Sequence, residues 1–183
     1  MNINITQGDI TNPVNTSKIN IIVHCVNNHG VMGAGVAAAL FMKWPQVRTE
    51  YVNWFKHNRP MFDLGEIQLV KCEPHILVCN LIGQKGFGGP ENIGGFNIPP
   101  VRYEALFEGF CYVREYIGNR VETYALHLPL LGAGLAGGDF SLVMKNFLKV
   151  FKDSGIETLF YAYSDKDYKL LETVYNDQYK KGN

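Results

Sequence analysis

Two kinds of segment alternate along the chain: short runs rich in β-branched and aromatic residues, and longer stretches with helical spacing. The run Ile19–Val26 is apolar at nearly every position, which is typical of a central strand covered on both faces. Runs of this kind predict six strands, at Asn2–Thr6, Ile19–Val26, Glu66–Lys71, His75–Ile82, Glu122–Leu128 and Thr158–Tyr163.

Stretches with apolar residues three or four positions apart lie between these runs and predict helices. They are Ala34–Lys43, Gln46–His57, Pro100–Tyr116, Phe140–Phe151 and Asp165–Tyr175. Ser164 is a plausible N-cap of the last helix, and Gly155 follows Phe140–Phe151 where a C-terminal cap would lie. Alternating strands and helices indicate an α/β fold, a mixed central sheet with helices on both faces.

No repeat or linker interrupts this alternation, so the sequence predicts a single domain over residues 1–183. Its core would run from about residue 3 to residue 175, and the polar tail 176–183 is expected to fray. Gly83–Pro100 breaks the pattern with six glycines and three prolines in eighteen residues. We interpret it as a long irregular loop of the kind that binds or covers a ligand.

Composition narrows the function classes. The 183 residues are 46% hydrophobic and 19% charged, which is typical of a folded domain. The 17 basic residues are balanced by 17 acidic ones, so the chain lacks the excess of positive charge that is typical of general nucleic-acid binding proteins. No stretch approaches the roughly 18 apolar residues of a membrane span, and no secretory signal is evident. The cysteines lack CxxC spacing and lie in apolar runs. We therefore expect buried free thiols, a cytoplasmic location and no metal site.

Two glycine-rich segments each join a predicted strand to a predicted helix. The first contains Gly30–Gly35 and the second Gly132–Gly138. Glycines let a backbone approach a ligand closely, and helix N-termini attract anions, so two such loops on one sheet can clamp a diphosphate. Neither has the Gly-Lys-Ser/Thr of a P-loop, and neither fits the spacing of the dinucleotide fingerprint.

Four motifs in order resemble the macro domain family. They are Gly8-Asp9-Ile10 after the first strand, the loop Asn27–Gly35, the loop Leu131–Gly138 and the ending Tyr163-Ser164-Asp165. Gly33–Ala37 and Pro99–Leu106 resemble the branch containing yeast-type ADP-ribose 1″-phosphate phosphatases, lysine-dependent ADP-ribosylglutamate hydrolases and their DNA-directed relatives. The resemblance implies a three-layer fold that binds ADP-ribose without a cofactor.

The resemblance also implies binding roles. Asp9 beside Gly8 would accept a hydrogen bond from the adenine amino group and the Ile10 amide would bind the ring, although Asp9 could instead be a turn residue. Tyr163 would lie against the adenine face, or pack in the core as a strand residue. Asn27 would hold the distal ribose hydroxyls. The diphosphate would meet backbone amides of Gly33, Ala34, Gly35, Val36, Gly132, Ala133, Gly134, Leu135 and Ala136.

Catalytic roles are less well matched. Gln84 stands where the lysine-dependent hydrolases carry their lysine, with Lys85 one residue later, and Ala136 stands at the place of their aspartate. The nearest acid, Asp139, could be a catalyst or the N-cap of the following helix.

Histidines offer other acid–base groups. His29 lies in the first loop and could act near neutral pH, whereas His24 and His127 lie in apolar strands that favour a core position.

Three functions follow from these residues. The first is hydrolysis of ADP-ribose 1″-phosphate, carried by His29, Asp139 and Asn27. The second is removal of ADP-ribose from protein or DNA, for which Lys85 is the support. The third is a reader that binds ADP-ribose without turnover. Expected partners are ADP-ribose or a derivative, together with an ADP-ribosylated protein or nucleic acid, and no membrane.

Overall fold

A six-stranded mixed sheet forms the centre of the computed structural model, which describes residues 2–134 and 137–180. Its strands are β1 (Asn2–Gln7), β2 (Ile19–Asn27), β3 (Ile67–Glu73), β4 (Ile76–Gln84), β7 (Tyr124–Leu128) and β8 (Glu157–Ala162). The order across the sheet is β1-β8-β7-β2-β4-β3, parallel throughout except that β3 pairs antiparallel with β4. Each predicted strand is confirmed, with bounds shifted by at most two residues.

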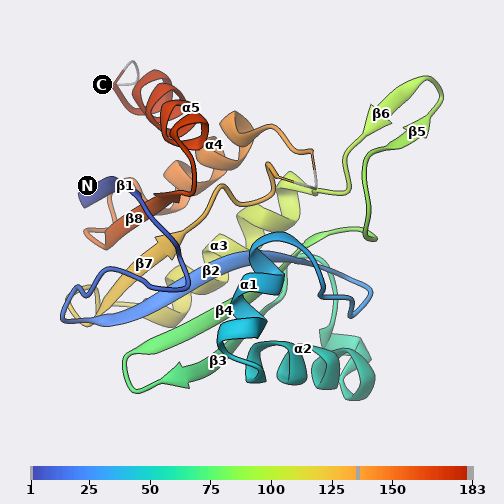
Figure 1. Ribbon diagram of the computed structural model, residues 1–183, viewed down its shortest axis with the longest axis horizontal. Helices are drawn as coiled ribbons and strands as arrows, with labels where there is room; N and C mark the ends of the chain where they lie inside the picture. Colours follow the sequence, from blue (N-terminus) through green and yellow to red (C-terminus); the bar gives the residue numbers. More distant parts are fainter. Residues whose placement is uncertain (1, 135–136, 181–183) are drawn as a thin grey trace.

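Helices cover both faces of this sheet, as predicted (Figure 1). They are α1 (Gly35–Lys43), α2 (Gln46–His57), α3 (Tyr103–Ile117), α4 (Phe140–Phe151) and α5 (Asp165–Tyr175). Helices α1 and α2 pack on one face, and α3, α4 and α5 pack on the other. The predicted three-layer α/β fold is therefore confirmed.

The period of two along β2 explains these layers. Ile21 and Val23 pack with α3 and α4, whereas Ile22 and Val26 pack with α1 and α2. Because successive side chains of a strand point to opposite faces, a strand covered on both faces needs apolar residues at nearly every position. Trp44 belongs to the second of these clusters, and Trp54 and Phe55 pack against it.

Helix α3 begins later than predicted, at Tyr103 instead of Pro100. Val101 instead forms an isolated bridge with Gln84 at the end of β4.

The cap predicted for the start of α5 is confirmed, whereas the cap predicted for the end of α4 is wrong. The C-cap of α4 is Lys152, so the prediction for Gly155 is wrong. This glycine (φ +73°) lies in the connection between α4 and β8. Ser164 caps α5 as predicted and forms a capping box with Asp167.

The segment Gly83–Pro100 is irregular only in part, which corrects the prediction of one long irregular loop. Strand β4 continues to Gln84, and a two-stranded hairpin follows, formed by β5 (Glu91–Ile93) and β6 (Phe96–Ile98). Gly94 and Gly95 join them with φ of +61° and +87°, the backbone of a two-residue hairpin turn. Figure 1 shows this hairpin projecting from the body of the molecule.

Two smaller expectations also fail. Residues 176–180 form a π-helical turn, η2 (Asn176–Lys180), instead of a frayed tail, because the rings of Tyr175 and Tyr179 stack 5.1 Å apart and Gln178 Nε2 donates to the carbonyl of Ser141. All four cysteines are free, as predicted, but Cys111 is exposed on α3 instead of buried.

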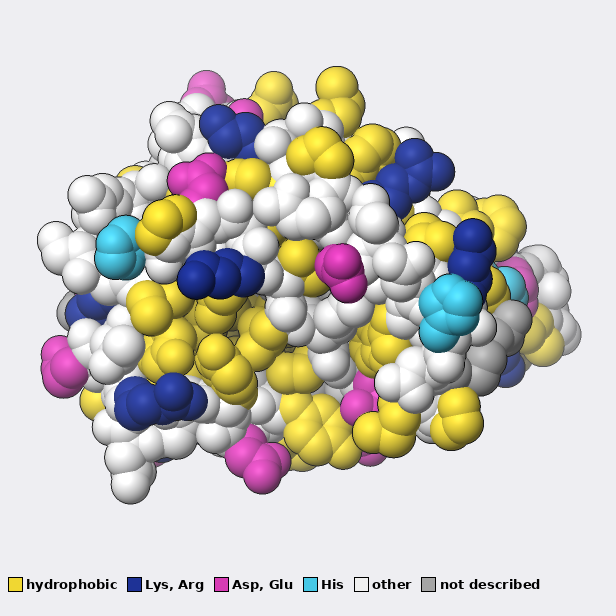
Figure 2. Space-filling view, turned by 90° about the horizontal axis from the view of Figure 1, so that it is seen from below, with side chains coloured by type: hydrophobic (Ala, Val, Ile, Leu, Met, Phe, Trp, Pro, Cys, Tyr) yellow, Lys and Arg dark blue, Asp and Glu magenta, His cyan; other side chains and the backbone are white. Residues whose placement is uncertain are grey.

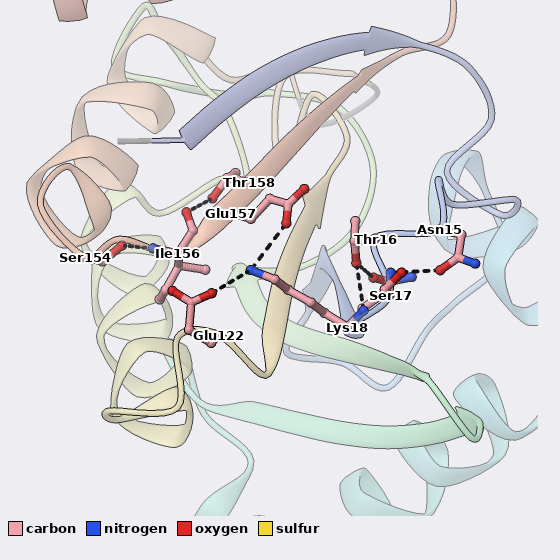
Figure 3. Close-up of polar contacts among 10 residues, drawn as sticks. Asn15, Thr16, Ser17, Lys18, Glu122, Ser154, Ile156, Glu157 and Thr158 are labelled. Atoms are coloured by element: carbon pink, nitrogen blue, oxygen red, sulfur yellow. Dashed lines mark hydrogen bonds and ion pairs between the residues drawn. The ribbon is translucent and has the colours of Figure 1, made fainter.

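The amino-terminal ends of the parallel strands are tied together by Lys18 (Figure 3). Its Nζ lies 3.4 Å from Glu157 Oε2 and 3.7 Å from Glu122 Oε2, which joins the segment before β2 to the starts of β7 and β8. In the preceding loop, Thr16 Oγ1 donates to Asn20 Oδ1 at 2.6 Å. These polar side chains serve the fold.

Charge is dispersed on the face shown in Figure 2, where Lys and Arg side chains lie apart, with Asp and Glu among them. This matches the equal numbers of basic and acidic residues in the sequence. Within residues 2–134 and 137–180, no helix is both long enough and apolar enough to cross a membrane.

Candidate ADP-ribose site

The predicted binding motifs converge on one edge of the sheet. Because β1, β8, β7 and β2 are neighbours and parallel, their carboxyl ends lie at the same edge. Gly8-Asp9-Ile10 leaves β1, Tyr163 leaves β8, and the two glycine-rich loops leave β7 and β2. The carboxyl edge of an open α/β sheet is where ligands usually bind.

Asn27 shapes the first glycine-rich loop, residues 27–35. Its buried side-chain oxygen accepts hydrogen bonds from His29 N (3.0 Å), Val31 N (3.3 Å) and the Tyr51 hydroxyl (3.2 Å). Its side-chain nitrogen donates to the carbonyl of Val31, and the Tyr51 hydroxyl also donates to the Asn27 carbonyl. Burial raises the pKa of Tyr51, so this hydroxyl stays a donor. Asn27 therefore has a structural role in addition to the predicted ribose contact.

Asn28 is a functional candidate that the sequence did not single out. Its backbone N–H donates to the Gln84 carbonyl, and its side-chain oxygen accepts from Gly86 N, both at 2.9 Å. The same oxygen lies 2.8 Å from Nδ1 of the exposed His29. The ring of His29 also contacts the Phe87 ring, with centroids 5.8 Å apart. A neighbouring pair of asparagines carries no signal in sequence that separates these two roles.

The start of α1 is open at the end of the first loop. Gly33, Ala34, Gly35 and Val36 are all exposed, and no side chain caps the N-cap residue Ala34. The first backbone N–H groups of a helix lack partners within it and attract anions. These four residues therefore present the backbone donors that the sequence predicted for a diphosphate.

The second glycine-rich loop, residues 131–138, is held by backbone hydrogen bonds. Gly138 N donates to the Gly132 carbonyl at 3.0 Å, and Gly137 N donates to the Gly134 carbonyl at 2.9 Å. A Cβ on Gly138 would lie 2.6 Å from the Gly132 oxygen, so this turn requires glycine. Ala133 is half-buried between these glycines. The predicted contacts Leu135 and Ala136 lie outside the described residues.

Asp139 forms the predicted N-cap. Its Oδ1 accepts from Ser141 N at 2.8 Å, and its own N–H donates to the Tyr103 hydroxyl at 2.8 Å. The cap prediction is confirmed, and the catalytic role of this exposed carboxylate stays a prediction. Tyr103 was not among the predicted site residues, because its hydroxyl contact joins residues far apart in sequence.

Asp9 and Tyr163 follow the ends of two neighbouring strands, β1 and β8. Gly8 N donates to the Ala162 carbonyl at 2.9 Å, which places the residues after β1 beside those after β8. Asp9 is exposed, and its Oδ1 accepts from Thr11 N at 2.9 Å, as in the turn role weighed for it. Ile10 is buried. Tyr163 is 82% exposed, so the core alternative for this residue is wrong.

Lys85 is exposed and lies at the base of the hairpin. Its N–H donates to the Pro100 carbonyl at 2.9 Å, and Gln84 pairs with Asn27 in the sheet register. A Cβ on Gly137 would lie 3.3 Å from Pro90, so the base of the hairpin also borders the second loop. The segment 84–100 therefore reaches both glycine-rich loops.

His24 and His127 occupy the core, as predicted. His24 Nε2 lies 2.6 Å from Asn80 Oδ1, and His127 Nδ1 lies 2.9 Å from the Tyr161 hydroxyl. Burial lowers the pKa of each ring from 6.5 to about 4, and for His24 the Asn80 contact offsets part of this. Both rings are therefore neutral near pH 7 and are unsuited to act as acids there.

A cavity of about 450 Å³ lies elsewhere, at the amino edge of the sheet beside Lys43 and His75. None of the predicted ligand-binding residues lines it. The residues that the structure describes contain no cluster of three or more His, Cys, Asp or Glu side chains able to hold a metal ion.

Comparison with known proteins identifies the family to which this fold belongs. No protein-family model matches the chain. A protein of unknown function from Bacteroides thetaiotaomicron is 30% identical with a TM-score of 0.79, over 88% of this chain and 98% of that one. A macrodomain protein from Streptomyces coelicolor is 30% identical with a TM-score of 0.72, over 88% of this chain and 99% of that one. The chain belongs to the macro domain family.

Other similar proteins include an enzyme of known activity, a viral polyprotein and a protein in complex with ADP-ribose. The ADP-ribose 1″-phosphate phosphatase of Candida albicans is 27% identical over 133 residues, covering 72% of this macro domain and 82% of that protein. Polyprotein P1234 of Eastern equine encephalitis virus is 27% identical over 147 residues. The match covers 80% of this chain but only 5% of the length of the polyprotein. Thermosipho africanus DarTG in complex with ADP-ribose shares the fold at 17% identity and a TM-score of 0.67, over 87% of this chain and 41% of that one.

Proposed function

We propose that this macro domain binds ADP-ribose at the carboxyl edge of its sheet and hydrolyses ADP-ribose 1″-phosphate to ADP-ribose and phosphate. The observation that carries the proposal is the convergence of Asp9, Tyr163 and both glycine-rich loops on that edge. The similarity to the Candida albicans phosphatase supports the choice of reaction.

The ligand would lie across the ends of four strands. Adenine would sit between the free carboxylate oxygen of Asp9 and the exposed ring of Tyr163, with the Ile10 amide at its edge. The diphosphate would accept hydrogen bonds from the backbone of Gly33–Val36 and of the second loop. The distal ribose would then reach Asn27 and His29.

Hydrolysis would use general base catalysis. His29 would accept a proton from a water molecule as that water attacks the terminal phosphorus, and backbone amides would stabilise the charge that develops on phosphate oxygens. Asp139 remains available through its second carboxylate oxygen, because Oδ1 caps α4.

Two alternatives remain. Lys85 is exposed beside the first loop, which supports removal of ADP-ribose from protein or DNA through a covalent lysine adduct. The use of Asp139 as a cap supports a reader that binds without turnover. We also propose a cytoplasmic location, which the four free cysteines support.

The test combines binding and turnover on one sample. ADP-ribose is titrated by calorimetry, and the same protein is then supplied with ADP-ribose 1″-phosphate while released phosphate is measured. Binding with phosphate release is the expected result. Binding without release contradicts the phosphatase proposal, and ADP-ribosylated glutamate and DNA substrates, with Lys85→Ala as the control, then separate the two alternatives.

A further inference from the structure

We propose that Asn28 is a positioning residue that holds His29 in the tautomer protonated on Nδ1, which leaves Nε2 as the proton acceptor. The role of that acceptor in catalysis rests on the proposed function, whereas the tautomer itself does not. Asn27 and Asn28 are adjacent, but their side chains make different contacts. Asn27 shapes the first loop, and Asn28 connects that loop to the segment that follows β4.

The first step is the orientation of the Asn28 amide. Gly86 N–H points to its side-chain oxygen with a donor–acceptor distance of 2.9 Å. A backbone N–H can only donate, so the atom that it meets must be the amide oxygen and not the nitrogen. The Asn28 backbone donates to the Gln84 carbonyl at 2.9 Å, so two hydrogen bonds join Asn28 to residues 84–86.

The second step is the ring of His29. Its Nδ1 lies 2.8 Å from the same amide oxygen, which has no proton to donate. Nδ1 must therefore carry the proton of this hydrogen bond. In a neutral imidazole the other nitrogen is then unprotonated, so Nε2 presents its lone pair. Phe87, the residue after Gly86, contacts the ring edge to face at an interplanar angle of 76°.

This tautomer is the one that base catalysis needs. Nε2 takes a proton from water as the water oxygen forms a bond to the terminal phosphorus. The bond from phosphorus to the 1″ oxygen of the ribose breaks, and its electron pair and the proton held on Nε2 go to that oxygen. The products are ADP-ribose and phosphate. With the proton on Nε2 instead, neutral His29 would face the water as a donor and could not start this sequence.

Nitrogen NMR tests the assignment directly. The ¹⁵N shifts of both His29 ring nitrogens are recorded about two units above the ordinary histidine pKa, with His29→Gln to assign the signals. Wild-type protein is expected to show a protonated Nδ1 and an unprotonated Nε2. Asn28→Ala should shift both signals toward the average of the two tautomers, whereas Asn28→Asp, which keeps the acceptor, should retain the wild-type pattern. A protonated Nε2 in the wild type, or an unchanged pattern in Asn28→Ala, overturns the proposal.

Turnover separates this inference from the proposed function. If both hold, Asn28→Ala lowers kcat for phosphate release by about tenfold or more and leaves the dissociation constant of ADP-ribose unchanged. If the wild-type protein shows the expected tautomer but releases no phosphate, the phosphatase proposal fails and the role of Asn28 in setting the tautomer stands. The wild-type spectrum decides the tautomer even if Asn28→Ala does not fold.

Discussion

The two glycine-rich loops begin at the ends of neighbouring parallel strands, but they are held in different ways. In the first loop, side chains determine the backbone: the Asn27 oxygen alone accepts three hydrogen bonds, and Tyr51 holds the loop from α2. In the second loop, backbone groups bond to one another, and the fold depends on having no side chain at Gly138. The first loop is therefore held largely by side-chain hydrogen bonds and the second by backbone hydrogen bonds.

Because the loops are held differently, each can contribute to ligand binding in a different way. A loop with its polar side chains already bonded holds a fixed shape and offers backbone donors at the start of α1. A loop held by glycines lets its backbone approach a ligand closely. The pair would suit the diphosphate of the proposed ligand.

The strands that lead into the two loops each contain a buried histidine, and the pH dependence of the free energy of unfolding tests this similarity. His24 in β2 and His127 in β7 have pKa values lowered from 6.5 to about 4 by burial. The unfolded chain takes up these protons first, so stability is complete above pH 6.5 and is lost as the pH falls toward 4. We expect the free energy of unfolding to fall by about 2 kcal/mol per histidine from about pH 7.5 to about pH 5.

Urea unfolding at the two pH values measures this loss. His24→Gln and His127→Gln should each remove about half of the pH dependence, because the two strands contribute equally. Equal stability of the wild type at both pH values contradicts the assignment of two buried neutral histidines.

Removing the Asn27 side chain should break the first loop alone. Asn27→Ala leaves the backbone N–H groups of His29 and Val31 without their shared acceptor, whereas the Tyr51 hydroxyl keeps its hydrogen bond to the carbonyl of residue 27. We expect a loss of about 3 kcal/mol in the free energy of unfolding. Chemical denaturation measures the loss. Tyr51→Phe, which removes one of the three donors, is the matched variant and should cost less; a larger loss in Tyr51→Phe would place the main support of the loop elsewhere.

Glycine substitutions sharpen the contrast, because each loop contains a crowded glycine and an open one. A Cβ on Gly30 would lie 2.5 Å from the Phe55 ring, whereas nothing lies within 4 Å of one on Gly33. Gly138 and Gly134 form the same pair in the second loop. Gly30→Ala and Gly138→Ala should each cost about 2 kcal/mol, measured by thermal unfolding. Gly33→Ala and Gly134→Ala should unfold at nearly the wild-type temperature.

A smaller loss of stability is expected at the end of the second loop. Asp139→Ala removes the N-cap of α4 and should cost about 1 kcal/mol, whereas Asp139→Asn keeps a capping oxygen and should cost less. Phosphate release by the Asn variant then isolates any catalytic role. Full activity in a folded Asp139→Asn would assign this residue to the cap alone.

Periodicity predicted most of the fold, because apolar spacing reports which faces are buried. It predicted all six sheet strands and the exact bounds of α2, α4 and α5. It did not predict the β5–β6 hairpin, whose strands are three residues long and exposed, so no buried face imposes a pattern on them.

The site was predicted as motifs and not as contacts. Glycines and the order of strands indicate where a ligand lies, whereas the contacts of Asn28 with Gly86 and of Asp139 with Tyr103 join residues 36 or more positions apart. The exposed ring of Tyr163 depended on β8 ending at Ala162, one residue before the predicted end.

The most direct test of the central claim is an ADP-ribose titration of wild type and Asp9→Asn. In the variant, the amide oxygen keeps the hydrogen bond from Thr11 N, so the turn should survive, while the amide nitrogen replaces the oxygen proposed to face the adenine amino group. Two donors would then meet. We predict binding in the wild type and a loss of about 1–3 kcal/mol in the variant with unchanged thermal stability. Equal dissociation constants for the two proteins would contradict the adenine assignment, and absence of binding in the wild type would contradict the account as a whole.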